Sequence, residues 1–188
     1  MVRNKNSKDV KEFTGNTAGG GSATNKTGLT FEEVIEIDFQ KKLKDSGYVE
    51  DGNDILKNGR VCATRYKKHD LYKILCEGNG INWEDMISGK KLPDDAIFMH
   101  ETKTLHIIEK KYQKSSGSND EKLESPHFKI RQYNKLLKPL NIKIKYCYVL
   151  SDWFRLENNR KYKDVFDYHE ELGVKHFFNE LPLDYLGL

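Results

Sequence analysis

The strongest constraint on the fold is a pair of apolar runs, residues 96–100 and 104–113, separated by the polar triplet Glu101-Thr102-Lys103. Two such runs with a short turn between them predict a β-hairpin. Charged residues mark one end of this hairpin. Pro93-Asp94-Asp95 stands before the first strand, and Glu109-Lys110-Lys111 closes the apolar part of the second.

The alternation of a β-strand puts Glu109, Lys111 and Gln113 on one face of the second strand and Lys110 on the other. The short turn brings the Asp94-Asp95 pair beside the end of that strand. Neighbouring carboxylates are suitable oxygen ligands for a hard cation such as Mg²⁺. A lysine on the same face can orient or deprotonate a water held there. Together these groups could carry out metal-assisted hydrolysis of a phosphodiester.

A bare Glu-x-Lys triplet carries little weight, because charged residues make up 32% of the chain. The triplet Asp120-Glu121-Lys122 is a similar match that lies in a polar segment. Residues 109–111 differ in their placement, since they follow the apolar run 105–108 and lie behind Pro93-Asp94. The alternative reading of this region is a solvated hairpin at the edge of a sheet.

The order Pro-Asp, apolar strand, Glu-x-Lys resembles the PD-(D/E)XK nuclease superfamily over roughly residues 29–178. This resemblance implies an α/β fold with an αβββαβ core, in which helices flank a central mixed sheet. Residues 25–32, 93–96 and 109–113 resemble the small type II restriction endonucleases. That closer resemblance implies Mg²⁺-dependent cleavage of double-stranded DNA at a short specific sequence.

The resemblance also implies roles for the matching residues. Asp94 and Glu109 are metal ligands, with Asp95 as the alternative to Asp94, and the backbone carbonyl of Lys110 also coordinates. The position directly after proline favours Asp94, and strand alternation allows only one of the two aspartates to be a primary ligand. Lys111 positions the attacking water and balances the charge of the transition state.

Enzymes of this superfamily often add a carboxylate from the first helix, where Glu32, Glu33 and Glu36 compete. Glu33 has a structural role, because Thr30 and Glu33 form the pattern of a capping box. Glu36 lies one turn beyond Glu32 on the same face. The resemblance of residues 25–32 to restriction endonucleases favours Glu32 as the catalytic glutamate, and the alternative is a glutamate on the helix surface.

Four residues are candidates for DNA contact. Gln113 shares a face with Lys111 and is placed either to touch the phosphate backbone or to be an exposed strand end. Lys129, Arg131 and Gln132 follow a predicted helix start at Ser125-Pro126. They either contact DNA or form the basic outer face of an ordinary amphipathic helix.

The length of 188 residues suits one domain. Residues 1–28 are polar and glycine-rich, which predicts a flexible arm, and residues 29–188 are the single nuclease domain that the resemblance implies. The net charge of +3 neither requires nor excludes nucleic acid, although basic residues are clustered. The absence of a signal peptide, of a membrane span and of paired cysteines predicts a cytoplasmic protein.

The remaining elements follow from periodicity and from helix-start and helix-stop residues. A polar loop over the metal site is predicted at 114–125. Helices are predicted at 30–44, 70–77, 83–87, 125–138 and 160–172, and strands at 60–66, 142–150 and 174–178.

A restriction endonuclease that reads a palindrome is expected to be a homodimer, and a companion methyltransferase without direct contact is a possible second component of the same system. Other readings of the chain stay open. It is alternatively a structure-selective or repair nuclease of the same fold, such as a junction resolvase, a DNA-binding module without cleavage, or a partner-binding accessory protein.

Overall fold

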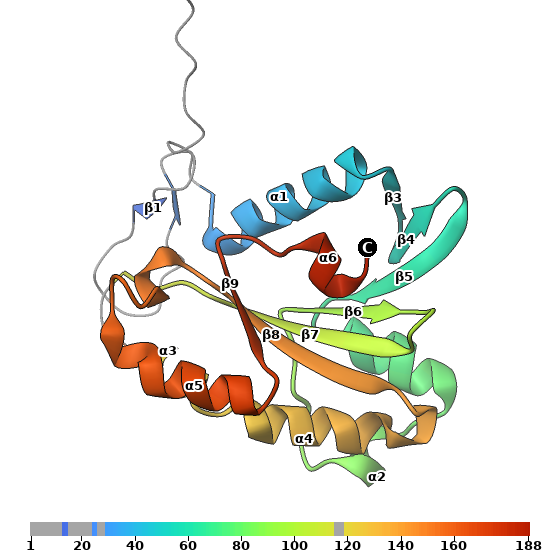
Figure 1. Cartoon of the computed structure of the whole chain (residues 1–188). Coiled ribbons are helices and arrows are strands. Elements are labelled where there is room, and N and C mark those ends of the chain that lie inside the picture. Colours follow the sequence, from blue (N-terminus) through green and yellow to red (C-terminus); the bar gives the residue numbers. More distant parts are fainter. Residues whose placement is uncertain (1–12, 15–23, 26–28, 115–118) are drawn as a thin grey trace, which may run out of the picture.

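A computed structural model describes residues 13–14, 24–25, 29–114 and 119–188. Within these ranges the chain forms a seven-stranded mixed β-sheet with helices on both faces (Figure 1). The predicted mixed α/β class is therefore confirmed. Most of the predicted arm, 1–28, lies outside the described residues. Two of its short segments, β1 (Phe13–Thr14) and β2 (Thr24–Asn25), pair antiparallel as a separate small sheet.

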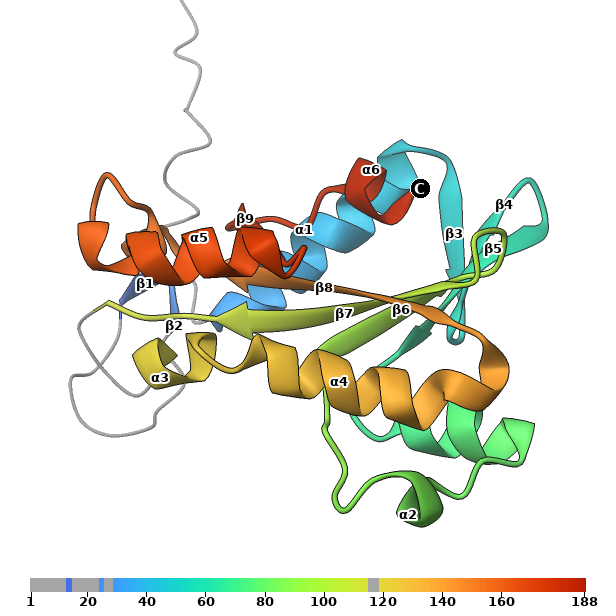
Figure 2. The same cartoon turned by 60° about the horizontal axis from the view of Figure 1, so that its bottom comes forward.

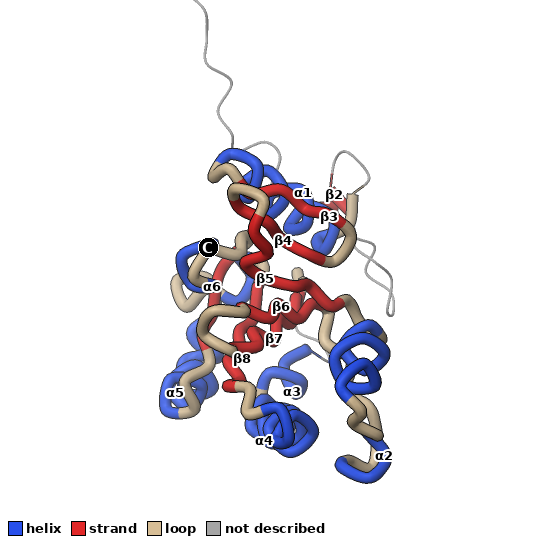
Figure 3. Tube along the Cα trace, turned by 90° about the vertical axis from the view of Figure 1, so that its right-hand side faces the viewer, coloured by secondary structure: helices blue, strands red, loops and turns tan. Residues whose placement is uncertain are grey.

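The strands of the main sheet are arranged in sequence order, from β3 at one edge to β9 at the other. Neighbours from β3 to β7 are antiparallel, and β7, β8 and β9 are parallel. Figure 3 shows the sheet running as a twisted band from β3 beside α1 down to β8. The strands are β3 (Tyr48–Asp51), β4 (Asp54–Lys57), β5 (Arg60–Tyr66), β6 (Asp95–Met99), β7 (Thr104–Lys111), β8 (Lys143–Leu150) and β9 (Lys175–Phe178).

The helices form a layer on each face of the sheet. Figures 1 and 2 show α1 and α6 on one face and α2 and α4 on the other. The α-helices are α1 (Phe31–Asp45), α2 (Trp83–Met86), α3 (Asn119–Leu123), α4 (Pro126–Leu137), α5 (Lys163–Glu171) and α6 (Leu183–Leu186). Shorter helical pieces are the π-helix η1 (Leu71–Cys76) and the 3₁₀ turns η2 (Glu77–Asn79), η3 (Lys138–Leu140), η4 (Asp152–Phe154) and η5 (Arg160–Tyr162).

The helix predicted at 30–44 is confirmed as α1, together with its capping box. The Thr30 hydroxyl accepts a hydrogen bond from the Glu33 backbone N–H, and the Glu33 carboxylate accepts one from the Thr30 N–H. These bonds satisfy two of the backbone donors that a helix start leaves unpaired. The apolar stripe that this register creates is buried against the sheet and consists of Phe31, Ile35, Phe39 and Leu43.

The predicted hairpin is also confirmed, with β6 and β7 joined by a turn at 100–103. Asp95 lies opposite Ile108 and Met99 lies opposite Thr104. The second strand ends at Lys111, two residues earlier than predicted. Gln113 therefore follows the strand, and it is buried rather than an exposed strand end.

Alternation along the central strands divides the core into two clusters. Ile97 and Ile108 belong to the cluster that contains the buried side chains of α1. Leu105, Ile107 and Tyr146 belong to the cluster that contains the buried side chains of α4. Each face of the sheet is thus apolar over its middle. Charged side chains at the strand ends on opposite faces are therefore separated by the sheet.

Several local predictions were wrong. Residues 48–57 form the hairpin β3–β4, which was not predicted because only Tyr48 and Ile55 are buried there. Residues 119–123 form helix α3 inside the predicted polar loop. The Ser125 hydroxyl makes no capping hydrogen bond at the start of α4. The helix predicted at 160–172 begins with a 3₁₀ turn.

None of the helices in the described ranges is long and apolar enough to cross a membrane. Cys62, Cys76 and Cys147 are free, and the last two are buried. Burial raises the pKa of the Cys76 thiol to about 11, which keeps it protonated at neutral pH.

Candidate active site at the end of strand β7

The end of β7 gathers three oxygen atoms around one ammonium group. Lys111 Nζ lies 2.9 Å from Glu109 Oε2, 3.2 Å from the Lys110 carbonyl oxygen and 3.5 Å from Asp94 Oδ2. Glu109 and Lys111 share a face because they are two residues apart on one strand. Asp94 is the residue just before β6, the strand that pairs with β7, and its carboxylate reaches the same point.

Glu109 is almost fully buried and has a second cationic partner. Lys129 Nζ, from α4, lies 2.9 Å from Glu109 Oε1. Burial opposes ionisation of this carboxyl, but the ammonium groups of Lys111 and Lys129 outweigh it and hold the pKa of Glu109 below its ordinary value. The site therefore contains an ionised glutamate at neutral pH.

Lys111 is also ionised. Burial disfavours its charge, yet the carboxylates of Glu109 and Asp94 raise the pKa of the Lys111 ammonium above its ordinary value. A lysine in this state is a hydrogen-bond donor and not a proton acceptor.

The two adjacent aspartates lie on opposite faces of the sheet. Asp94 Oδ2 accepts a hydrogen bond of 2.7 Å from the Lys110 backbone N–H, beside Glu109 and Lys111. Asp95 is buried on the α1 face, where its Oδ2 lies 2.6 Å from Lys110 Nζ. Of the two candidates, the structure brings Asp94 together with Glu109 and places Asp95 apart from it.

Asp95 belongs to a buried charge cluster beneath the site. Arg65 Nε donates to Asp95 Oδ1 at 2.9 Å, and the two terminal nitrogens of Arg65 donate to Glu36 at 2.8 and 2.5 Å. Burial disfavours the ionised form of Asp95, but Lys110 and Arg65 hold its pKa below the ordinary value. The cluster fixes the Lys110 side chain, while the backbone of the same residue contributes to the site on the other face.

The glutamate that α1 directs toward the sheet is Glu36 and not Glu32. Glu32 is exposed, whereas Glu36 binds Arg65 and lies 3.2 Å from Lys67 Nζ. The structure does not bring Glu32 together with Asp94 and Glu109. Sequence reasoning overlooked the role of Arg65. A signal was present, because an arginine between the apolar side chains of Ala63 and Tyr66 in a strand needs an acidic partner when it is buried.

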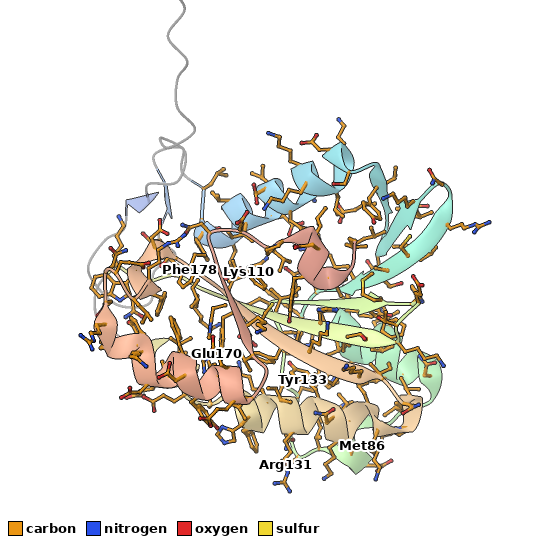
Figure 4. The ribbon with its side chains drawn as sticks, viewed as in Figure 1. Met86, Lys110, Arg131, Tyr133, Glu170 and Phe178 are labelled. Atoms are coloured by element: carbon orange, nitrogen blue, oxygen red, sulfur yellow. The ribbon has the colours of Figure 1, made fainter. Side chains whose placement is uncertain are left out.

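The candidate DNA-contacting residues of α4 do not all face the site. Lys129 lies in the site itself, paired with Glu109. Arg131 is exposed and extends from α4 away from the sheet, whereas Tyr133 lies between α4 and the sheet (Figure 4). Gln132 is half-buried. Lys129 is therefore the member of this helical group that faces the site.

Two tyrosines hold the segment that leads into Asp94. The hydroxyls of Tyr72 and Tyr133 each donate to the Lys91 carbonyl at 2.9 Å, and the Lys91 backbone N–H donates to the Tyr72 oxygen at 2.6 Å. The backbone is thereby fixed three residues before Asp94. No short sequence pattern relates Tyr72 and Tyr133 to this loop, so sequence analysis did not find them.

The donor set at Lys111 suits a hard cation. Among the described residues no three or more His, Cys, Asp or Glu side chains are grouped to hold a metal ion. The oxygens around Lys111 Nζ come from two carboxylates and one carbonyl. Mg²⁺ commonly binds through one or two carboxylates and retains several waters. The Lys111 ammonium occupies the point where Asp94, Glu109 and the Lys110 carbonyl meet, which is where a cation balances their charge.

Comparisons of the chain with protein-family models, with curated proteins and with solved structures found no match.

Proposed function

We propose that the protein is a Mg²⁺-dependent type II restriction endonuclease of the PD-(D/E)XK kind, which hydrolyses phosphodiester bonds of double-stranded DNA at a short specific sequence. One observation carries the proposal. Asp94 Oδ2, Glu109 Oε2 and the Lys110 carbonyl lie around Lys111 Nζ, an arrangement that resembles the Asp, Glu-x-Lys constellation expected for that superfamily.

The order of elements supports the same proposal. A helix, α1, is followed by the hairpin β3–β4 and then by the antiparallel strands β5, β6 and β7, with η1, η2 and α2 between β5 and β6. The helices α3 and α4 come next, before β8, which lies parallel to β7. If the hairpin β3–β4 and the short helical segments are taken as additions, the remaining order is the αβββαβ order expected for the superfamily. The candidate residues lie at the end of β7, the third strand of that core.

In this proposal Asp94, Glu109 and the Lys110 carbonyl would hold Mg²⁺, and the ion would supply electrostatic stabilisation of the charge that develops on the phosphate oxygens. The Lys111 ammonium, which pairs with these oxygens here, would leave them to the ion and donate a hydrogen bond to the attacking water. Lys129, paired with the other oxygen of Glu109, would place its ammonium beside the site for a phosphate oxygen.

The substrate follows from the charge of the site. Lys111 and Lys129 provide two ammonium groups beside the carboxylates, and phosphate contacts by such groups supply much of the affinity for DNA. A homodimer would present two such sites to the two strands of a palindrome. We infer both partners, DNA and a second copy of the chain, from this chemistry.

A digest of several unmodified DNAs of known sequence tests the proposal, with purified protein, Mg²⁺ and the Glu109→Ala variant beside it. Discrete bands that the variant does not produce are expected. Cutting by the variant at the wild-type rate would overturn the assignment of the site. A smear, or cutting restricted to branched DNA, would instead favour a repair nuclease or a junction resolvase, and binding without cutting would favour a DNA-binding module.

A further inference from the structure

Phe128 is an aromatic side chain at the surface of the protein. It is 47% exposed on α4, whereas every other Phe, Tyr and Trp side chain within 29–114 and 119–188 is buried or half-buried. Aromatic rings contribute large apolar areas to cores and interfaces when they are covered. The Phe128 ring is therefore available to contact another molecule.

Two separate contacts place Phe128 beside the candidate active site. Lys129, the next residue of α4, has its Nζ 2.9 Å from Glu109 Oε1. Lys91 Nζ lies 5.4 Å from the centroid of the Phe128 ring, and Lys91 is three residues before Asp94. The exposed ring and the carboxylates of the site are thus connected from both ends of one short stretch of surface.

The lysine that lies over the ring has a fixed backbone. The hydroxyls of Tyr72 and Tyr133 each donate to the Lys91 carbonyl at 2.9 Å, and the Lys91 N–H donates to the Tyr72 oxygen at 2.6 Å. The Lys91 side chain takes no part in these bonds. Its ammonium can therefore exchange the cation–π contact for an anionic partner while the backbone stays in place.

The groups around the ring suit a polyanion that also offers flat apolar surfaces. Lys91 and Lys129 put two ammonium groups beside the ring, and Leu92, which is 40% exposed, follows Lys91 in the chain. Duplex DNA provides both kinds of partner. Its phosphates attract ammonium groups, and several DNA-binding proteins insert Phe or Leu side chains between neighbouring base pairs.

We propose that Phe128 inserts into a base step of the double-stranded DNA substrate beside the scissile phosphate, while Lys91 pairs with a phosphate of that step. Insertion of an apolar side chain unstacks the step and bends the duplex. A bent duplex contacts more of the protein surface, which holds the strand beside Asp94 and Glu109. The inference rests on the proposed function for the identity of the substrate.

The linking number of a closed circular DNA detects such an insertion without knowledge of the recognised sequence. A relaxed plasmid is saturated with protein in the presence of Ca²⁺ and treated with a topoisomerase that needs no divalent ion. The topoisomers are then separated after removal of the protein. Every protein in this assay carries Glu109→Ala, so that the plasmid stays closed. Retention of the plasmid on a filter measures binding by the same proteins.

The protein with Phe128 intact should lower the linking number, because insertion untwists the step. Phe128→Ala should abolish this change and weaken binding about tenfold, since the stacking contact is lost. Phe128→Trp keeps a flat ring and should retain the change. Ile37→Ala is the matched control, at a side chain that is 53% exposed on α1, across the sheet from α4 (Figure 2), and it should behave as the parent protein.

Lys91→Met tests the phosphate contact. The variant keeps the backbone bonds to Tyr72 and Tyr133, so its urea midpoint should not change. The slope of log affinity against log salt concentration should fall by about one, because one phosphate contact is lost. Lys44→Met, at an exposed position of α1, should keep the parent slope.

Three outcomes would overturn the inference. The first is binding of the plasmid by the parent protein without any change in linking number. The second is a Phe128→Ala protein that still changes the linking number, and the third is an unaltered salt slope in Lys91→Met. A protein that binds no DNA at all would reject this inference together with the endonuclease.

Digestion with Mg²⁺ in proteins that retain Glu109 separates the inference from the proposed function. Cutting that depends on Glu109, with a linking number that does not depend on Phe128, rejects the insertion alone. A linking number that depends on Phe128, without cutting by the wild-type protein, rejects the endonuclease alone. If both proposals hold, Phe128→Ala should cut about tenfold more slowly than the wild-type protein at saturating concentration, and Ile37→Ala should cut at the wild-type rate.

Discussion

Asp94 and Asp95 are consecutive residues whose carboxylates lie on opposite faces of one sheet. Asp94 Oδ2 lies 3.5 Å from Lys111 Nζ, and Asp95 Oδ2 lies 2.6 Å from Lys110 Nζ. The ion pair Asp94–Lys111 therefore lies on one face of the sheet, and the ion pair Asp95–Lys110 lies on the other. The α4 face receives the groups proposed for catalysis, and the α1 face receives the groups that hold the strand end in place.

Asp95→Ala should lower the stability of the protein. It would leave Arg65 and Lys110 buried without their shared carboxylate, and removing one partner of a buried ion pair costs roughly 3–5 kcal/mol. The free energy of unfolding, measured by urea titration, checks this value. Asp94→Ala is the matched control, since Asp94 is more exposed and should cost only about 1 kcal/mol. Equal losses in the two variants would contradict the division between the faces.

Lys110→Met and Lys111→Met should separate structure from catalysis. The Lys110 side chain reaches only the α1 face, where its loss leaves Asp95 with Arg65 alone, so the main effect should be on the free energy of unfolding. Lys111→Met leaves Glu109 with Lys129 alone, so it should also lower the free energy of unfolding, but in the folded variant it should in addition lower the cleavage rate by about 10²-fold or more.

The rate of cleavage under single-turnover conditions measures catalysis in the two variants, and the urea midpoint measures their stability. The assignment of Lys110 to structure and of Lys111 to catalysis fails if Lys110→Met loses cleavage at unchanged stability. It also fails if Lys111→Met cuts DNA at the wild-type rate.

Lys129→Met should increase the affinity of the site for a divalent cation. Lys129 Nζ pairs with Glu109 Oε1, the oxygen next to the one proposed for the cation, and so adds a positive charge that repels the cation. A charge at this distance in a partly exposed position contributes about 1 kcal/mol, or about fivefold in affinity. Calorimetric titration with Ca²⁺ measures the change. Lys135→Met, at an exposed position on the same helix, should leave the affinity unchanged, and weaker Ca²⁺ binding by Lys129→Met would refute the repulsion by Lys129.

The hairpin and the helix α1 could be predicted because their signals are local. The polar triplet between two apolar runs indicated the β6–β7 turn, and the Thr30–Glu33 pattern indicated the start of α1. The partition of Asp94 and Asp95 also follows from alternation along a strand. These predictions need only the neighbours of each residue in the chain.

The parts that were missed depend on contacts between distant segments. Glu32 was preferred to Glu36 on the resemblance of residues 25–32 to restriction endonucleases, and only the position of Arg65, 29 residues after Glu36, shows which of them binds at the sheet. The role of Tyr72 at Lys91 likewise depends on the path of a loop. Hairpin β3–β4 lacked a regular apolar alternation, since one of its faces is largely exposed.

Acidification should weaken the fold before the carboxylates titrate. Burial lowers the pKa of His106 to about 4 and that of His176 to about 3, whereas an unfolded histidine titrates near 6.5. Below pH 6.5 the unfolded chain binds protons that the folded chain does not, so stability is greatest above this pH and falls as the pH decreases toward 4. Each histidine should contribute a loss of roughly 1.4 kcal/mol per pH unit well below 6.5.

Urea unfolding at pH 7.5, 6.0 and 5.0 measures this loss, and His106→Leu identifies one of its sources. His106 is buried beside the Tyr185 ring, and its Nδ1 has no hydrogen-bond partner within the described chain, so leucine should be accommodated there. The variant should lose less stability than the wild-type protein between pH 6.0 and 5.0. His127→Gln, at an exposed position, should retain the wild-type dependence. An unchanged pH dependence in His106→Leu would show that the buried imidazole does not control acid stability, because Asp95 and Glu109 titrate only at lower pH.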